Sequence, residues 1–205
     1  IQMEFTDTPA MWKDSVTTKL WIAELTPLRC FYDYEIYKKS QTDNEPVLVC
    51  KGFICYSIID IETGKPERVD EIMSKFTVVD KKVFGNHPKV LIAPGSAPDG
   101  VDGHRVKAAD IDFNMHVSNL KYLESAINTE SYEFYLEHVQ SYIKLKFLKQ
   151  TFSGDTISSE WYDKGEGKRV YMIRNSAGEE VARAEILWIK KKADKYAVLD
   201  GFDRN

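Results

Sequence analysis

The chain has 205 residues, 43% of them apolar and 29% charged, which is typical of a globular protein and not of a disordered or fibrous one. The net charge of −4 provides no overall positive field, so composition does not favour nucleic-acid binding. No apolar run approaches the roughly 20 residues of a membrane-spanning helix, and no signal-peptide pattern opens the sequence. A cytoplasmic protein is therefore expected. The cysteines, Cys30, Cys50 and Cys55, form no CxxC pair, which favours reduced core thiols over a disulfide or a metal site.

Two stretches in the first half of the chain resemble two stretches in the second half, which indicates an internal duplication. Lys13–Trp21 (KDSVTTKLW) is similar to Gly154–Tyr162 (GDTISSEWY), and Val49–Ile58 (VCKGFICYSI) is similar to Val181–Lys190 (VARAEILWIK). Identity between the copies is low, so coincidence is the alternative. The shared order of the blocks and their shared alternation favour a genuine repeat.

Each copy is predicted to form antiparallel strands. Within Val181–Ile189, four small or apolar residues alternate with three others, which is the period of a half-buried strand. Ser141–Gln150 has the same period, with Lys144 and Lys146 on the polar face. The segment Asn175–Gly178 (NSAG) contains the residues that hairpin turns prefer.

The second copy also contains a predicted helix. Val117–Asn128 (VSNLKYLESAIN) places Leu120, Leu123 and Ile127 on one stripe at helical spacing, with Tyr122 as a further candidate, and a shorter helix is expected over Thr129–His138. Ser118 or Asn119 is a candidate cap for the first helix. The order strand, helix, then a meander of strands predicts an α+β fold, in which a curved antiparallel sheet wraps around a central helix. This arrangement is called a hotdog fold.

The two copies predict tandem hotdog domains, residues 1–61 and 102–205, joined by a linker over 62–101 that is rich in proline and glycine and carries a short helix near residues 70–76. Residues 102–154 precede the block that begins at Asp155, whereas only residues 1–13 precede its counterpart at Asp14. The first copy is therefore expected to lack its first strand and its central helix. With the missing initiator methionine, this predicts an N-terminally shortened chain, the alternative being a degenerate first copy. A sheet without its helix should expose apolar side chains such as Trp21, Ile36 and Ile54.

The most informative motif is Ala109–Tyr122 (ADIDFNMHVSNLKY), in which Asp112, Asn114 and His116 alternate just before the predicted helix. Unpaired N–H groups at the helix start, near Val117 and Ser118, and the positive end of the helix dipole can stabilise an oxyanion there. A thioester carbonyl at this point would face a carboxylate, an amide and an imidazole. An Asx-rich loop that only caps the helix is the alternative.

The segment DIDFNMHVSNLKY resembles the pattern of the acyl-ACP thioesterase family, in which Asp, Asn and His alternate before Val, a polar residue, Asn and Tyr. The segments 14–36, 59–66 and 144–155 are also similar to that family. The resemblance implies two hotdog domains, the first shaping a tunnel for the acyl chain and the second carrying hydrolysis. It implies a substrate from fatty acid biosynthesis, a fatty acyl chain on the phosphopantetheine arm of acyl carrier protein. No cofactor is implied, and no clustered Cys/His pattern predicts a metal.

The sequence departs from the family at one position. The family usually has a glutamate, or sometimes a nearby cysteine, on the strand after the helix, and alignment at Gly154 and Asp155 places Gln150 there. A neutral amide can orient water but cannot act as a general base. Our interpretation is that His116 and Asp112 activate water, that Asn114 fixes substrate or water, and that Gln150 is a second water-orienting group. Which residue is the general base stays open.

An acidic carrier protein requires local positive charge. The candidates are Arg105 and Lys107 before the motif, and Lys144, Lys146 and Lys149 after the helices, although ordinary solvated strand faces are the alternative. Two other functions stay open: a thioesterase or dehydratase for coenzyme A esters, and a non-catalytic acyl-binding hotdog protein, which Gln150 favours. The sequence also leaves a homodimer and the preferred acyl chain length open.

Overall fold

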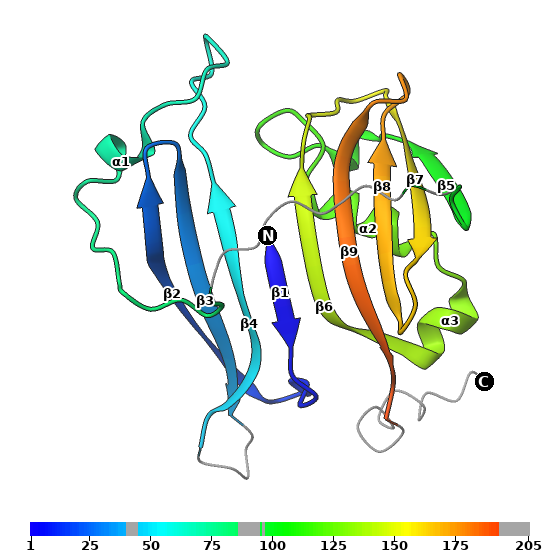
Figure 1. Ribbon diagram of the computed structural model, residues 1–205, viewed down its shortest axis with the longest axis horizontal. Coiled ribbons are helices and arrows are strands. Elements are labelled where there is room, and N and C mark those ends of the chain that lie inside the picture. Colours follow the sequence, from blue (N-terminus) through cyan, green and yellow to red (C-terminus); the bar gives the residue numbers. More distant parts are fainter. Residues whose placement is uncertain (40–44, 86–94, 96, 193–205) are drawn as a thin grey trace. The chain divides into compact units, whose positions relative to one another are not determined.

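The computed structural model describes residues 1–39, 45–85, 95 and 97–192, and Figure 1 shows its elements in chain order. The chain divides into two compact units, Ile1–Pro88 (unit 1) and Lys89–Asn205 (unit 2), each built on antiparallel strands. Within the described ranges, no helix combines the length and the apolar character needed to cross a membrane.

Unit 2 is a five-stranded antiparallel sheet with α2 (Asn119–Ile127) packed on one face, against β7, β8 and β9 (Figure 1). The strands lie in the order β6-β9-β8-β7-β5. Between β5 and β6 the chain forms a short 3-10 turn, η1 (Ala108–Asp110), then α2 and α3 (Tyr132–Glu137). The strand, helix and meander order predicted from the sequence is confirmed. The strand bounds are β5 (Gly100–Arg105), β6 (His138–Phe147), β7 (Thr156–Asp163), β8 (Lys168–Arg174) and β9 (Glu180–Lys190).

The core of unit 2 lies between this sheet and α2. Along β9 the inward residues Ala182, Ala184, Ile186 and Trp188 are at most 2% exposed, whereas the residues between them are partly exposed. The predicted alternation is therefore confirmed. Burying each large apolar side chain here contributes about 1.5–3 kcal/mol. Two alanines at the centre of the strand leave room for the helix to approach.

The buried face of α2 differs from the predicted stripe. Tyr122, Ser125 and Ala126 are buried, at the spacing i, i+3, i+4, whereas Leu120 is 68% exposed. Two of the buried residues are small, which lets the helix backbone approach the sheet closely. The Ser125 and Ser159 hydroxyl oxygens are 2.7 Å apart and share a buried hydrogen bond. Of the predicted candidates Tyr122 is buried, whereas Leu120 is not, because small side chains let the helix pack closely on the sheet.

Unit 1 repeats most of this sheet. Its strands lie in the order β2-β3-β4-β1, with bounds β1 (Gln2–Phe5), β2 (Ser15–Thr26), β3 (Arg29–Lys39) and β4 (Val47–Tyr56). Ile36 pairs with Cys50 across β3 and β4, and its counterpart Ile173 pairs with Ala182 across β8 and β9. The registers agree with the repeat inferred from sequence, so β2, β3 and β4 correspond to β7, β8 and β9.

The first strand of unit 1, β1, was missed by the sequence analysis. It pairs with β4 as β6 pairs with β9: Gly52 lies opposite Met3, and its counterpart Ala184 lies opposite Leu145. β1 is therefore the counterpart of β6. In residues 1–39 and 45–85, unit 1 contains no counterpart of β5 or α2, which are the elements that the repeat predicted to be missing.

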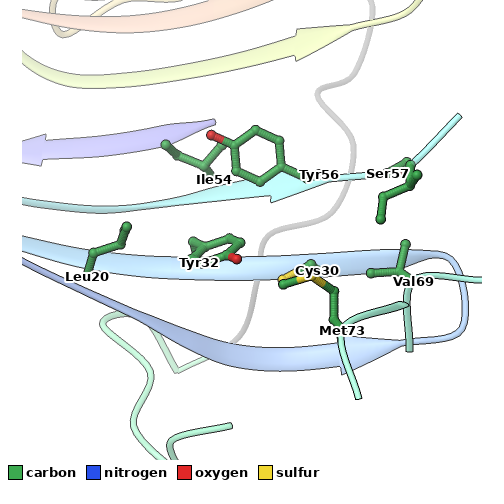
Figure 2. A pocket seen from close by; sticks show the side chains of 9 residues that line it. Leu20, Cys30, Tyr32, Ile54, Tyr56, Ser57, Val69 and Met73 are labelled. Atoms are coloured by element: carbon green, nitrogen blue, oxygen red, sulfur yellow. The ribbon is translucent and has the colours of Figure 1, made fainter. Parts of the chain in front are cut away.

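The face of the unit 1 sheet that corresponds to the helix-bearing face of unit 2 carries an open cavity (Figure 2). The four-residue helix α1 (Val69–Ile72) covers one end, where Val69 packs with Ile22 and Cys30. Elsewhere Leu20 and Tyr56 on this face are exposed. The side chains expected to face solvent, Trp21, Ile36 and Ile54, are only partly exposed, and Trp21 contacts Lys81. The three cysteines are free thiols. The cavity has a volume of about 540 Å³ and is lined by Leu20, Cys30, Tyr32, Ile54, Tyr56, Ser57, Ile58, Val69 and Met73.

Part of the predicted linker over 62–101 belongs to unit 1. α1 lies close to the short helix expected near residues 70–76, and Val78 pairs with the edge strand β2 opposite Ile22. The Val79 N–H donates to the Ile22 carbonyl at 2.8 Å, and further on the Trp21 indole N–H donates to the Lys81 carbonyl at 2.8 Å. These contacts follow no sequence period, so they could not be predicted from the sequence. Residues 86–94 and 96 of the predicted linker lie outside the described residues.

Candidate active site

Residues 110–118, directly before α2, form a small β-hairpin that we call the motif hairpin. The Asp112 N–H donates to the His116 carbonyl at 3.0 Å, and the Met115 N–H donates to the Asp112 carbonyl at 3.0 Å. The sequence predicted only that the motif precedes a helix. The hairpin places Asp112 and His116 opposite each other across a three-residue loop.

The same hydrogen-bonding pattern occurs in the hairpin that begins at Asn175, which was predicted as a turn. There Gly178 has φ 75°, and in the motif hairpin Met115 occupies the equivalent position with φ 64°. In both hairpins a side-chain oxygen at the first position accepts a backbone N–H two residues on; the Asn114 N–H donates to Asp112 Oδ1 at 2.8 Å. A left-handed conformation costs a non-glycine residue about 1–2 kcal/mol, so Met115 adds local strain beside the motif.

Asp112 and His116 are only partly open to solvent, with side chains 24% and 20% exposed. Asp112 Oδ1 lies 3.9 Å from His116 Nδ1, which is too long for a hydrogen bond. His116 Nδ1 also lies 3.3 Å from the Val117 carbonyl oxygen, which can accept a proton from it. If Nδ1 carries the proton, Nε2 has the free lone pair. Asn114 is exposed in the hairpin loop.

Gln150 is exposed on the turn between β6 and β7, beside the motif hairpin. The next residue, Thr151, is fully buried, and its carbonyl accepts the Val117 N–H at 2.8 Å. Val117 follows His116 directly, and Thr151 follows Gln150. The Val117–Thr151 hydrogen bond therefore joins the two backbone segments that carry His116 and Gln150. The structure thus places Asp112, Asn114, His116 and Gln150 in one region of unit 2.

The expected oxyanion donors, Val117 and Ser118, are not available. The Val117 N–H donates to the Thr151 carbonyl, and the Ser118 N–H donates to the Asp110 carbonyl at 2.8 Å. Ser118 is the N-cap residue of α2 by position, but its side chain makes no capping hydrogen bond. The helix begins one residue later, and the N–H groups of its first two residues, Asn119 and Leu120, have no acceptor within the helix. The oxyanion role predicted for Val117 and Ser118 is therefore corrected, because both amides are already used by the hairpin and the turn.

The five basic candidates do not form one patch. Arg105 ends β5, Lys107 precedes the turn into the motif hairpin, and Lys149, which is paired with Glu179, precedes Gln150. Lys144 and Lys146 lie on β6, which β9, β8 and β7 separate from β5 in the sheet. Burial lowers the pKa of the Lys144 amine, so this side chain is not an ordinary surface charge.

A buried polar network at the other end of α2 was not anticipated. The Glu130 carboxylate, 2% exposed, accepts from the Arg169 guanidinium and from the Tyr171 hydroxyl. Arg169 lies over the Phe134 and Trp161 rings, 4.0 and 4.3 Å from their centroids. Burial lowers the pKa of Arg169 and raises that of Tyr171. The network ties the segment after α2 to the sheet. No group of three or more His, Cys, Asp or Glu side chains in the described ranges is arranged to hold a metal ion.

Residues 98–190 match the sequence model of the acyl-ACP thioesterase C-terminal domain. Two solved structures have similar folds. The 12:0-ACP thioesterase from Umbellularia californica matches with a TM-score of 0.78 at 19% identity, over 93% of this chain and 73% of the plant chain. The acyl-ACP thioesterase from Bacteroides thetaiotaomicron VPI-5482 matches with a TM-score of 0.75 at 15% identity, over 92% of this chain and 74% of the bacterial chain.

The two structural matches confirm the predicted α+β fold class with hotdog sheets. A search of curated protein sequences found no match. The matched residues include the motif hairpin, α2, the turn that carries Gln150 and all five strands of unit 2. In sequence, residues 98–190 are thus similar to the acyl-ACP thioesterase C-terminal domain.

Proposed function

We propose that the chain is a thioester hydrolase that releases a free fatty acid from acyl carrier protein. The observation that carries this proposal is the family match, because the matched residues include the motif hairpin and Gln150. The geometry supports it: a carboxylate, an imidazole and two amides lie together at the start of a helix, where the dipole favours developing negative charge.

In this proposal His116 is the general base. Its Nδ1 faces the Val117 carbonyl and, at 3.9 Å, the Asp112 carboxylate. Both oxygens favour a proton on Nδ1, which leaves the Nε2 lone pair to take a proton from water as the water attacks the thioester carbonyl carbon. Asp112 stabilises the imidazolium that forms. Its own Oδ1 is already an acceptor for the Asn114 N–H, so positioning suits it better than proton abstraction.

The remaining polar groups handle the substrate. The tetrahedral oxyanion is assigned to the N–H groups of Asn119 and Leu120, in place of the two amides engaged elsewhere. Asn114 and Gln150 orient the water or the thioester through their side-chain amides. Collapse of the intermediate breaks the carbon–sulfur bond, and the imidazolium returns its proton to the leaving thiolate. The products are the fatty acid and the thiol of the carrier.

We assign the acyl chain to unit 1. Its open cavity of about 540 Å³ is lined mostly by apolar and aromatic side chains, with the Tyr32 and Tyr56 rings in edge-to-face contact at 5.8 Å (Figure 2). Such a surface suits an alkyl chain, which offers no polar groups to a binding site.

A hydrolysis assay tests the function directly. The purified protein is assayed with fatty acyl esters of acyl carrier protein and of coenzyme A over a series of chain lengths, and the hydrolysis rates are compared. Faster hydrolysis of the carrier-protein esters is expected. Preference for coenzyme A esters would favour the alternative thioesterase. Tight acyl binding without turnover would favour a non-catalytic acyl-binding protein, the function that Gln150 supports.

The Gln150 position supplies a gain-of-function prediction. Gln150→Glu should maintain or raise kcat, because a carboxylate beside the motif hairpin adds a group able to accept a proton from water. Gln150→Leu, which removes the polar head, is the matched control and should lower kcat. Steady-state kinetics on an acyl carrier protein ester measure both variants. A large loss of activity in Gln150→Glu would remove Gln150 from the proposed site.

Charge reversal tests which basic residues face the carrier protein. Lys107→Glu with Lys149→Glu should slow the reaction of carrier-protein esters at low salt, because steering of an acidic partner depends on local positive charge. Coenzyme A esters should be less affected. Lys144→Glu with Lys146→Glu tests the β6 pair in the same way. Whichever double variant shows the salt-dependent loss identifies the docking side; equal effects on both ester classes would discard the docking role.

A further inference from the structure

We propose that Tyr122 and Thr151 act as a positioning pair that holds Gln150 against the motif hairpin. This inference rests on the thioesterase function proposed above and adds two residues that touch neither substrate nor water. Tyr122 belongs to α2, and Thr151 belongs to the turn between β6 and β7.

Thr151 is hydrogen-bonded to the motif segment at two points. Its carbonyl accepts the Val117 N–H at 2.8 Å, and its hydroxyl oxygen lies 2.6 Å from the Tyr122 hydroxyl oxygen. Thr151 is 0% exposed and Tyr122 is 2% exposed. At a buried position no water can replace a lost partner, so breaking the hydroxyl pair leaves a polar group unsatisfied. The two bonds therefore fix the turn relative to both the hairpin and the helix.

Both members of the pair are themselves held rigidly. Threonine is branched at Cβ, which restricts its side-chain rotation. The Tyr122 ring packs on Phe147, with centroids 5.8 Å apart and planes inclined at 56°. Burial raises the pKa of the Tyr122 phenol, so the hydroxyl keeps its proton at neutral pH. The hydroxyl pair is thus a fixed, neutral hydrogen bond.

The pair bears on catalysis through the adjacent residues. Val117 follows His116 and Thr151 follows Gln150, so the Val117–Thr151 hydrogen bond lies one residue from each group of the proposed site. Gln150 is exposed on a turn, and its direction depends on the backbone of that turn. A displacement of about 1 Å in a reacting group can lower a rate by about 100-fold. A residue that only fills the core would not act on kcat through Gln150.

The test is a cycle of Tyr122→Phe and Gln150→Ala, with kcat and KM measured on a fatty acyl carrier-protein ester. In the wild-type background Tyr122→Phe should lower kcat about tenfold with little change in KM. In the Gln150→Ala background it should have almost no further effect, because the two residues act in series. Tyr135→Phe, the same change at an exposed tyrosine of α3, is the control and should leave kcat unchanged. Equal fold losses in both backgrounds would overturn the proposal.

A second variant separates positioning from stability. Tyr122→Phe alone leaves the Thr151 hydroxyl unpaired and should lower the melting temperature. In the double variant Tyr122→Phe with Thr151→Val both hydroxyls are absent, so the melting temperature should return toward the wild-type value. The kcat should stay low, whereas Thr151→Ser alone, which keeps the hydroxyl, should retain activity. Recovery of kcat together with the melting temperature would show that the pair only packs the core. A wild-type chain that hydrolyses no thioester refutes the proposed function and this inference together; an active wild type with an unaffected Tyr122→Phe variant refutes the positioning pair alone.

Discussion

Replacing His116 with alanine should lower kcat by about 10²–10⁴-fold, which is the usual contribution of a positioned general base. His116 is 20% exposed and sits in the strand of the motif hairpin, so the loss of its ring should not unfold unit 2. The measurement is steady-state hydrolysis of an acyl carrier-protein ester, with circular dichroism to confirm the fold. His104→Ala on β5 is the matched control, because it removes an imidazole outside the motif and should leave kcat near the wild-type value.

Two substitutions at Asp112 separate the effect of its charge from the effect of its hydrogen bond to the Asn114 N–H. Asp112→Ala removes the carboxylate and also the acceptor for the Asn114 N–H, so it should lower kcat to a similar extent and loosen the hairpin loop. Asp112→Asn keeps a side-chain oxygen for that hydrogen bond and removes only the charge. If the charge stabilises the imidazolium, Asp112→Asn should also lose activity while keeping its melting temperature. Rates near normal in both His116→Ala and Asp112→Ala would remove the motif from the mechanism.

Replacing Glu130 with alanine should destabilise the chain by about 3–5 kcal/mol, the range for breaking a buried ion pair on one side. The Glu130 side chain is 2% exposed and accepts from both Arg169 and Tyr171, so its loss leaves the buried Tyr171 hydroxyl and the half-buried Arg169 guanidinium without this acceptor. For a chain of this size the melting temperature should fall by roughly 10 °C or more. Thermal unfolding followed by circular dichroism measures it.

The matched control for Glu130→Ala is Glu179→Ala, which removes a carboxylate from an exposed ion pair with Lys149. Surface pairs are screened by water and contribute little, so this variant should melt close to the wild type. A drop in melting temperature as large as that of Glu130→Ala would mean that burial is not what makes the network stabilising. The Glu130→Ala variant should also keep its kcat at temperatures where it is folded, because the network lies at the opposite end of α2 from the motif hairpin.

The sequence by itself determined the elements whose signal is local. The alternation along Val181–Ile189 predicted a strand buried on one face, and the observed burial follows it from Ala182 to Trp188, whereas Val181 is buried as well. The repeat predicted equivalent registers in the two units, and the pairings of Ile36 and Ile173 agree with it. These predictions succeed because side-chain period and turn chemistry are set by neighbours along the chain. The position of the motif next to a helix could be predicted for the same reason, because helix spacing is also a local pattern.

Only the tertiary structure decided which groups are free to act and which face of α2 is buried. Whether the Val117 N–H is available depends on Thr151, 34 positions further along the chain, whose carbonyl takes it. The buried face of the helix depends on how closely Ser125 can approach Ser159, and the Glu130 network joins the loop after α2 to β8. Hydrogen bonds and close packing between distant segments leave no period in the sequence. For that reason the sequence located the motif, whereas the fold determined which of its amides and side chains remain available for chemistry.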